Sequence, residues 1–243
     1  MIFLLVILVL VIILRLFNNR GKKQQYNTDK ELYFERSRRL FEKVTTSDRG
    51  AYAERSLIVK LLKYGVPAQT IFHDLYLKRP NGSFSQIDLV VVTTAGIIVF
   101  EVKDYSGWIF GKGYQSNWTQ VLAYGKQKYR FYNPIMQNNK HINDLKRTRK
   151  QFENIPFYSV IVFDGDCELR DISFVPEGTF VVKEDRVLEV LSIIQAYEPA
   201  PYTDKHEVIS IMREAVENRE NRETEQLHID NVTNLLGKHR VFD

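Results

Sequence analysis

The chain opens with an uninterrupted apolar run. Residues 1–14 contain no polar side chain, and Leu16 and Phe17 extend the run beyond Arg15. At about 1.5 Å of rise per residue, a helix over residues 1–17 would span roughly 25 Å, which is the short end for a bilayer crossing. No basic residue precedes the run and no small-residue cleavage site follows it, which favours an anchor over a secretory signal peptide. We therefore expect a transmembrane helix at residues 1–17, with the lipid bilayer as its partner.

The charges after this run predict its orientation. Arg15, Arg20, Lys22 and Lys23 all follow the apolar residues, and basic residues prefer the cytoplasmic side of a membrane. The expected location is the cell membrane, single-pass, with the N-terminus outside and the C-terminal domain in the cytoplasm. A single cysteine, Cys167, suits a reducing compartment and excludes an intrachain disulfide framework.

Two segments of different character follow the apolar run. Residues 18–48 are rich in charge and lack an apolar run, so they are interpreted as a juxtamembrane linker. Apolar residues then recur at helical spacing from Leu57 to Leu62, and Gly65 and Pro67 come directly after them. This pattern predicts a helix over residues 48–64.

The rest of the chain alternates between strand and helix patterns. Apolar runs separated by turn residues predict an antiparallel meander of strands at 70–78, 86–92 and 97–103. One or two short strands are expected around Trp108 and Trp118, and Asn133-Pro134 predicts the start of a helix running to about residue 152. Further strands are expected at 158–163 and 180–183, and helices at 186–196 and 206–217. The expected class is α/β (α+β), with a core domain at 49–163 and an α/β extension at 164–243 that completes or packs on the core.

The hairpin formed by the second and third strands carries the candidate chemistry. A turn centred on Thr94 and Ala95 makes Asp88 face Glu101 and makes Gln86 face Lys103. Side chains alternate along a strand, so these four would share one face while Ile87 and Val102 project from the other. Two opposed carboxylates repel unless a cation lies between them. Carboxylates suit Mg²⁺ or Mn²⁺, and Lys103 could act on an attacking water or on a phosphate.

A solvated strand face with cross-strand ion pairs is the alternative interpretation of these residues. Two details favour a functional site. Asp88 lies inside the apolar run Ile87 to Val92, and Glu101 ends the apolar run Ile97 to Phe100. Charged residues so placed in strands usually serve a function.

The sequence also resembles a known family. The pair formed by Asp88 and Glu101-x-Lys103 matches the core of the PD-(D/E)xK nucleases, and the larger set is similar to the nuclease-related (NERD) domain between about Arg49 and Val162. The matching elements are Gly50-x-x-x-Glu54, Gln86-Ile87-Asp88, Gly96-Ile97-x-Val99-x-Glu101-x-Lys103, Gly107, and Asn133-Pro134-x-x-Gln137-Asn138-x-x-His141-Ile142-x-x-Leu145. Ile87 stands where the older superfamily pattern has proline.

The resemblance implies a restriction-endonuclease-like core, that is, a mixed sheet with the antiparallel meander flanked by helices, and a role in DNA processing. Glu54 matches a helix glutamate of the family and is expected to bind metal or water, although a capping or surface role is the alternative without the resemblance. Gln137 and His141 lie one turn apart on the helix after Pro134. We expect them to contact substrate or the outer shell of the metal. The alternative interpretation is an ordinary solvated helix surface.

Two interpretations of function remain open. The first is a membrane-anchored, Mg²⁺-dependent (or Mn²⁺-dependent) nuclease that hydrolyses DNA at the cytoplasmic face. The second is a catalytically silent nucleic-acid-binding or membrane interaction module on the same fold. The sequence does not identify protein partners. The expected site consists of catalytic residues Glu54, Asp88, Glu101 and Lys103, metal ligands Asp88, Glu101 and Glu54, and supporting residues Gln86, Gln137 and His141.

Overall fold

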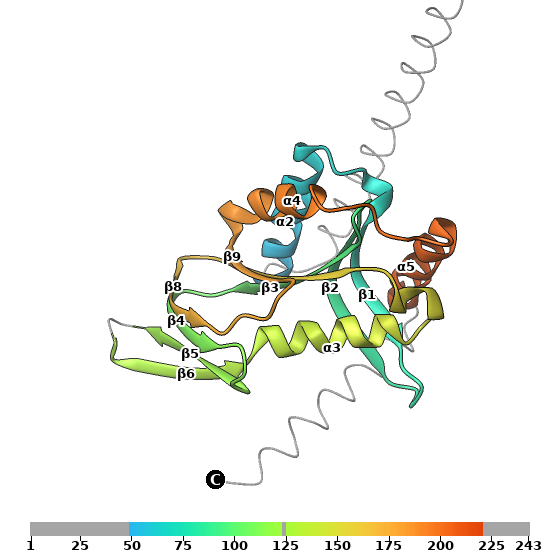
Figure 1. Ribbon diagram of the computed structural model, residues 1–243. Coiled ribbons are helices and arrows are strands. Elements are labelled where there is room, and N and C mark those ends of the chain that lie inside the picture. Colours follow the sequence, from blue (N-terminus) through green and yellow to red (C-terminus); the bar gives the residue numbers. More distant parts are fainter. Residues whose placement is uncertain (1–48, 123–124, 221–243) are drawn as a thin grey trace, which may run out of the picture.

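The computed structural model describes residues 49–122 and 125–220 (Figure 1). The expected transmembrane segment at residues 1–17 and the linker at 18–48 lie outside this range and stay predictions. None of the helices in the described part of the chain is long and apolar enough to cross a membrane.

A mixed sheet of five strands forms the centre of the molecule. Its order is β1-β2-β3-β7-β9, with β1 to β3 antiparallel and β3, β7 and β9 parallel. The expected meander and the later strands are thus confirmed with shifts of one or two residues. The strands are β1 (Ile71–Lys78), β2 (Phe84–Val92), β3 (Ile97–Asp104), β7 (Phe157–Asp164) and β9 (Thr179–Lys183).

Helices cover both faces of this sheet, as Figure 1 shows. One face packs against α2 (Arg49–Tyr64) and α4 (Val187–Gln195). The other packs against α3 (Pro134–Lys146) and α5 (Lys205–Glu220). Strands buried on both sides need continuous apolar runs, which explains why β3 and β7 could be found from sequence. Short 3₁₀ turns join some of these elements in the described part of the chain, namely η1 (Ala68–Thr70), η3 (Lys150–Glu153) and η4 (Glu184–Arg186).

A second, four-stranded sheet lies beside the N-terminal end of α3. Its order is β6-β5-β4-β8, and only the β4–β8 pair is parallel. Its strands are β4 (Gly107–Lys112), β5 (Asn117–Leu122), β6 (Gln127–Tyr132) and β8 (Cys167–Ser173). Trp118 is fully buried and its ring stacks on Phe163, 6.2 Å away, so this tryptophan serves the core. The two mixed sheets with flanking helices fit the expected α+β, nuclease-like class.

Helix α3 is fixed by two buried asparagines. Asn133 is the N-cap, accepting a hydrogen bond from the Ile135 amide at 2.9 Å and donating to the carbonyls of Gly113 and Gln115. Asn138 donates to the Val99 carbonyl at 2.8 Å and so ties the helix to β3. The helix ends at Lys146 rather than near residue 152.

The cap predicts a stability effect. Asn133→Ala removes the N-cap and leaves buried carbonyls without a donor, so we expect a loss of about 2–4 kcal/mol in the free energy of unfolding. Asn143→Ala, an exposed position on the same helix, should change it by less than about 0.5 kcal/mol. Urea unfolding of both variants measures the difference. Equal stabilities would contradict the role of the cap in holding α3.

Candidate active site

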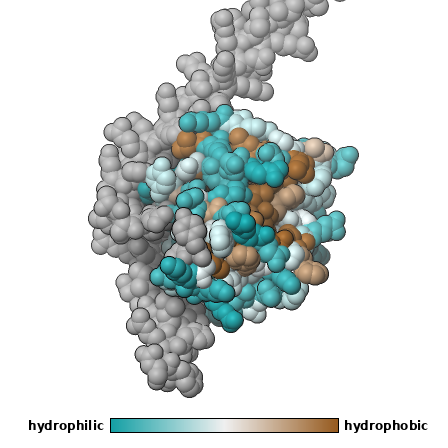
Figure 2. All heavy atoms as spheres, turned by 90° about the vertical axis from the view of Figure 1, so that its left-hand side faces the viewer, coloured by the Kyte–Doolittle hydropathy of each residue, from teal (hydrophilic) through white to brown (hydrophobic). Residues whose placement is uncertain are grey.

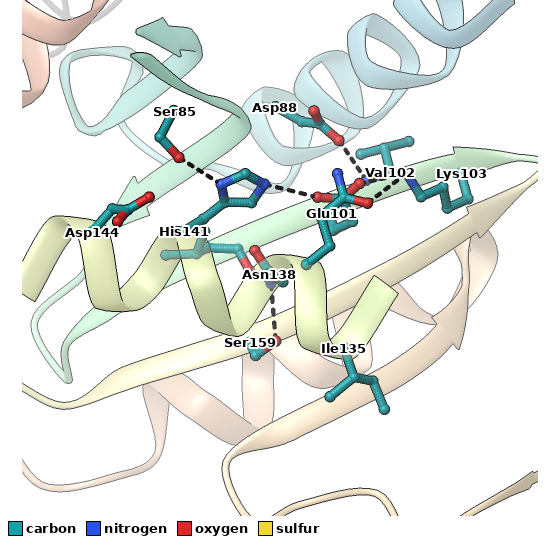
Figure 3. Close-up of polar contacts among 12 residues, drawn as sticks. Ser85, Asp88, Glu101, Val102, Lys103, Ile135, Asn138, His141, Asp144 and Ser159 are labelled. Atoms are coloured by element: carbon teal, nitrogen blue, oxygen red, sulfur yellow. Dashed lines mark hydrogen bonds and ion pairs between the residues drawn. The ribbon is translucent and has the colours of Figure 1, made fainter. Parts of the chain in front are cut away.

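Strands β2 and β3 separate at the candidate site. Their paired residues run from Val92↔Ile97 to Leu89↔Phe100, which is the register predicted from the turn. The ladder ends there, one residue before Asp88 and Glu101 would pair. Instead, Asp88 Oδ2 accepts a hydrogen bond from the Val102 amide at 2.9 Å (Figure 3). The Asp88 carboxylate therefore lies where the two strands part.

Glu101 is the most deeply buried acid of the site. Its side chain is 1% exposed, and Lys103 Nζ lies 2.5 Å from its Oε1. On the other side, His141 Nε2 lies 3.5 Å from Oε2. Apart from the lysine contact, no donor among the described residues hydrogen-bonds either oxygen. The carboxylate thus retains capacity to bind a cation.

The charges at the site shift one another's pKa. Burial raises the pKa of Asp88 well above its usual value, and the negative charges of Glu101 and Glu54 add to this, while the Val102 amide and Lys103 oppose it. Burial lowers the pKa of Lys103, but the charge and hydrogen bond of Glu101 outweigh it, so the net pKa is raised. Lys103 is therefore protonated at neutral pH.

Glu54 approaches the site from α2 but is already engaged. Its Oε2 lies 2.7 Å from Nε2 of His73 on β1. The charge of Glu54 still acts on Asp88. His73 was missed by the sequence reasoning, because only the packing of α2 against the sheet brings these two residues together.

Gln86 does not lie opposite Lys103 as the hairpin predicted. It donates instead to Asp74 Oδ1 at 2.8 Å. The physical reason is a break in the β1–β2 ladder, which passes from His73↔Leu89 directly to Leu75↔Ile87. Asp74, between them, has a left-handed backbone with φ 56°.

The same break corrects the expected face of Ile87. The hairpin placed Ile87 and Val102 together on the face away from the acids. In the structure Ile87 packs under α3 and α5, whereas Val102 packs under α2. The strict alternation assumed from the sequence fails at the point where β2 leaves β3.

The two polar residues expected from α3 do reach the site. Lys103 Nζ donates to Gln137 Oε1 at 3.3 Å, and His141 lies between Ser85 and Glu101 (Figure 3). Tyr105 is a further neighbour that the sequence reasoning missed: burial raises its pKa, the Lys103 charge lowers it and the Glu101 charge raises it.

A chain of polar groups leads from Asp144 to His141. Asp144 holds Arg79 by an ion pair at 2.7 Å, and Arg79 donates to Ser85 Oγ at 3.0 Å. Ser85 Oγ also forms a hydrogen bond with His141 Nδ1, 2.9 Å away, in which either atom can be the donor. When the hydroxyl donates, a neutral His141 ring carries its proton on Nε2, facing Glu101. Ser85 and Arg79 could not be predicted as site residues from the sequence, since their role depends on contacts with a helix that is distant in the chain.

The carboxylates of the site suit a hard divalent cation that is bound by only a few protein ligands. The described residues contain no group of three His, Cys, Asp or Glu side chains arranged to hold a metal ion. Mg²⁺, however, is commonly bound through one or two carboxylates together with water and substrate phosphate. Asp88 and Glu101 offer two carboxylates, one of them with oxygens that still lack hydrogen bonds.

Part of the chain is similar to proteins of a known family. Residues 49–164 match the model of the nuclease-related domain. The match supports the family suggested by the motifs, and it indicates a nuclease-like or nucleic-acid-related role. An uncharacterized protein of Bacillus anthracis is 30% identical to the chain over 125 residues, which is 51% of this chain and 57% of that protein. No solved structure matches the chain significantly.

The raised pKa of Asp88 predicts a stability effect. An acid whose pKa is higher in the folded protein costs stability as pH rises from its unfolded value, about 3.9, through its folded value. Asp88→Asn should therefore raise the melting temperature of the metal-free protein at neutral pH, by roughly 2–4 °C per kcal/mol of repulsion removed. The gain should vanish at pH values below the unfolded pKa.

The matched control for this experiment should change the melting temperature in the opposite direction. Asp144→Asn breaks the ion pair with Arg79 and should lower the melting temperature at neutral pH. Thermal melts with EDTA across a pH series measure both variants. A lower melting temperature for Asp88→Asn at neutral pH would show that the acids do not repel.

Proposed function

We propose that this protein is a metal-dependent phosphodiesterase that hydrolyses nucleic acid, with DNA as the first substrate to test. The observation that carries the proposal is the buried Glu101 carboxylate, 1% exposed and 2.5 Å from Lys103. A second acid, Asp88, has its pKa raised by burial and by the charges of Glu101 and Glu54. Burying carboxylates beside each other costs stability, and a site for a cation explains why the fold tolerates it.

The metal would be held by Asp88 and Glu101, with Mg²⁺ or Mn²⁺ as the ions that fit carboxylate oxygens. Such an ion supplies charge that polarises a phosphate or a bound water. Glu54 is paired with His73 in this structure, so we assign it an electrostatic role on Asp88 rather than direct binding. His141 directs its Nε2 toward Glu101 and so helps to orient that carboxylate.

Lys103 is assigned to the phosphate rather than to proton abstraction. Its pKa is raised by Glu101, so the side chain is an ammonium that cannot accept a proton. An ammonium can offset the negative charge that develops on a phosphate during hydrolysis. Gln137, which accepts a hydrogen bond from Lys103 Nζ at 3.3 Å, would hold the ammonium in position.

A silent nucleic-acid-binding module is the second candidate. The observation that favours it is that no three-residue metal cluster exists within residues 49–122 and 125–220. Against it stands the complete set of Glu54, Asp88, Glu101 and Lys103, since a binding module has no need for buried acids.

The test separates metal binding from cleavage. Mg²⁺ or Mn²⁺ should raise the melting temperature of the protein, because a ligand that binds only the folded state stabilises it. Lys103→Ala should reduce metal-dependent cleavage of DNA by roughly a hundredfold or more. The same variant should melt lower without metal, because Glu101 loses its partner, and should still gain stability when metal is added.

The control is Lys63→Ala, an exposed lysine at the end of α2, which should cleave like the wild type. Cleavage that persists in Lys103→Ala would refute the assigned role of the lysine. Metal-induced stabilisation without cleavage in the wild type would favour the silent module.

We also propose that residues 1–17 anchor the protein in the cell membrane, with the N-terminus outside and the catalytic domain in the cytoplasm. The support is the apolar run followed by Arg15, Arg20, Lys22 and Lys23. Protease added to intact cells should therefore leave the C-terminal domain undigested, whereas lysed cells should not protect it. Digestion in intact cells would reverse the proposed topology.

A further inference from the structure

One stretch of the chain next to the site is devoid of acids. Residues 105–143 contain no Asp or Glu, whereas the whole chain contains 30. This stretch forms β4, β5, β6 and the first turns of α3. Its basic residues are Lys112, Lys126, Lys128, Arg130 and Lys140. Strand β8 of the same sheet places Glu168 beside Trp108 and Asp171 beside Phe110, so the acid-free part of the surface is its β6 side, where positive charge attracts anions.

The strand register shows which side chains share the outer face of this sheet. Trp118 and Phe131 pair with each other and pack in the core. Side chains alternate along strands, so the residues next to Trp118 on β5 and next to Phe131 on β6 point to the outer face. Arg130 thus lies on the outer face in one row with Thr119 and Phe110.

A second cross-strand row on the outer face also holds one cation and one aromatic ring. Lys128 pairs with Val121, which pairs with Trp108. Tyr132 lies on the same face beyond Arg130 and is 51% exposed. Figure 2 faces this side of the molecule and shows hydrophilic and hydrophobic residues next to each other. The two cations on β6 thus share one face with Tyr132 on the same strand and with Trp108 and Phe110 two strands away on β4.

The β6 cations are available to a ligand. On the opposite edge of the sheet, Arg170 pairs with Glu168 at 2.9 Å and lies over the Trp108 ring. By contrast, Lys128 and Arg130 are exposed and form no ion pair within the described part of the chain. An anion bound along β6 would not have to displace an internal partner.

The end of β6 leads to the candidate active site. Tyr132 precedes the N-cap Asn133, and Gln137 in the first turns of α3 accepts the hydrogen bond from Lys103 at 3.3 Å. Strand β4 begins three residues after β3 ends at Asp104. Figure 1 shows the sheet at this end of α3. Strand β6 therefore leads directly into the helix whose Gln137 contacts Lys103 of the site.

We propose that the β6 side of this outer face, formed by Lys128, Arg130 and Tyr132, binds single-stranded nucleic acid and guides it to the site. The direction toward the site rests on the proposed function, whereas the binding face does not. Cations bind phosphates, and an exposed aromatic ring such as that of Tyr132 stacks on a base. The ring favours a single strand, because the bases of a duplex are already stacked on each other.

The test uses full-length protein in a neutral detergent with EDTA present, so that binding is measured without cleavage. Fluorescence anisotropy of a labelled oligothymidylate should show binding that weakens as salt rises. Replacing both Lys128 and Arg130 by alanine should reduce the slope of log K against log salt by about 1.4, since each phosphate contact on a single strand contributes about 0.7. Tyr132→Ala should weaken binding roughly tenfold, and Tyr132→Phe should restore it.

The control removes two exposed cations elsewhere, Lys63 on α2 and Arg213 on α5. Their double alanine variant should bind like the wild type, and all variants should melt within a few degrees of it. An equal loss in this control would overturn the proposal, and so would tighter binding of a duplex of matched length. Binding to vesicles of anionic lipid that is weakened by the Lys128 and Arg130 double variant, without binding to the oligonucleotide, would assign the face to a membrane surface instead. Absence of cleavage with Mg²⁺ would refute only the proposed function.

Discussion

A carboxylate buried almost completely, that of Glu101, is the constraint on which the rest of the site depends. A buried charge is tolerated only when partners compensate it. Lys103 supplies the opposite charge at 2.5 Å, and His141 faces the second oxygen. The position of His141 requires α3, and α3 is held in turn by Asn133 and Asn138. The helix caps and the buried asparagines are therefore part of the electrostatics of the site.

Lys103 compensates the buried carboxylates of the site only in part. One ammonium serves Glu101, while burial, together with the negative charges of Glu101 and Glu54, raises the pKa of Asp88. The fold brings Asp88 there by separating β2 from β3 after Leu89↔Phe100. A regular ladder would have paired the Val102 amide with the backbone of β2. The separation frees that amide for the Asp88 carboxylate.

Local signals allowed the sequence to predict the meander, the register of the hairpin and the start of α3. Apolar runs and turn residues define these elements within a few positions. Strand β6 was not predicted because its side chains are mostly exposed and show no apolar alternation. The contacts Glu54–His73 and Ser85–His141 could not be predicted either, since they join elements far apart in the chain. The hydrophobic periodicity of the sequence also did not predict the break in the β1–β2 ladder at Asp74, where Gln86 turns toward Asp74 and away from Lys103.

The distribution of charge shows how an acidic site could accept a polyanion. Three carboxylates close together repel phosphate, and charge–charge forces reach only about 8 Å at physiological salt. A substrate therefore needs cations within that distance of its path. The stretch between Asp104 and Asp144 supplies them without a single acid, and it joins the site at both ends, through β3 and through α3. The acids proposed to bind metal and the cations proposed to bind phosphate thus lie in different segments of the chain, which the fold joins through β3 and α3.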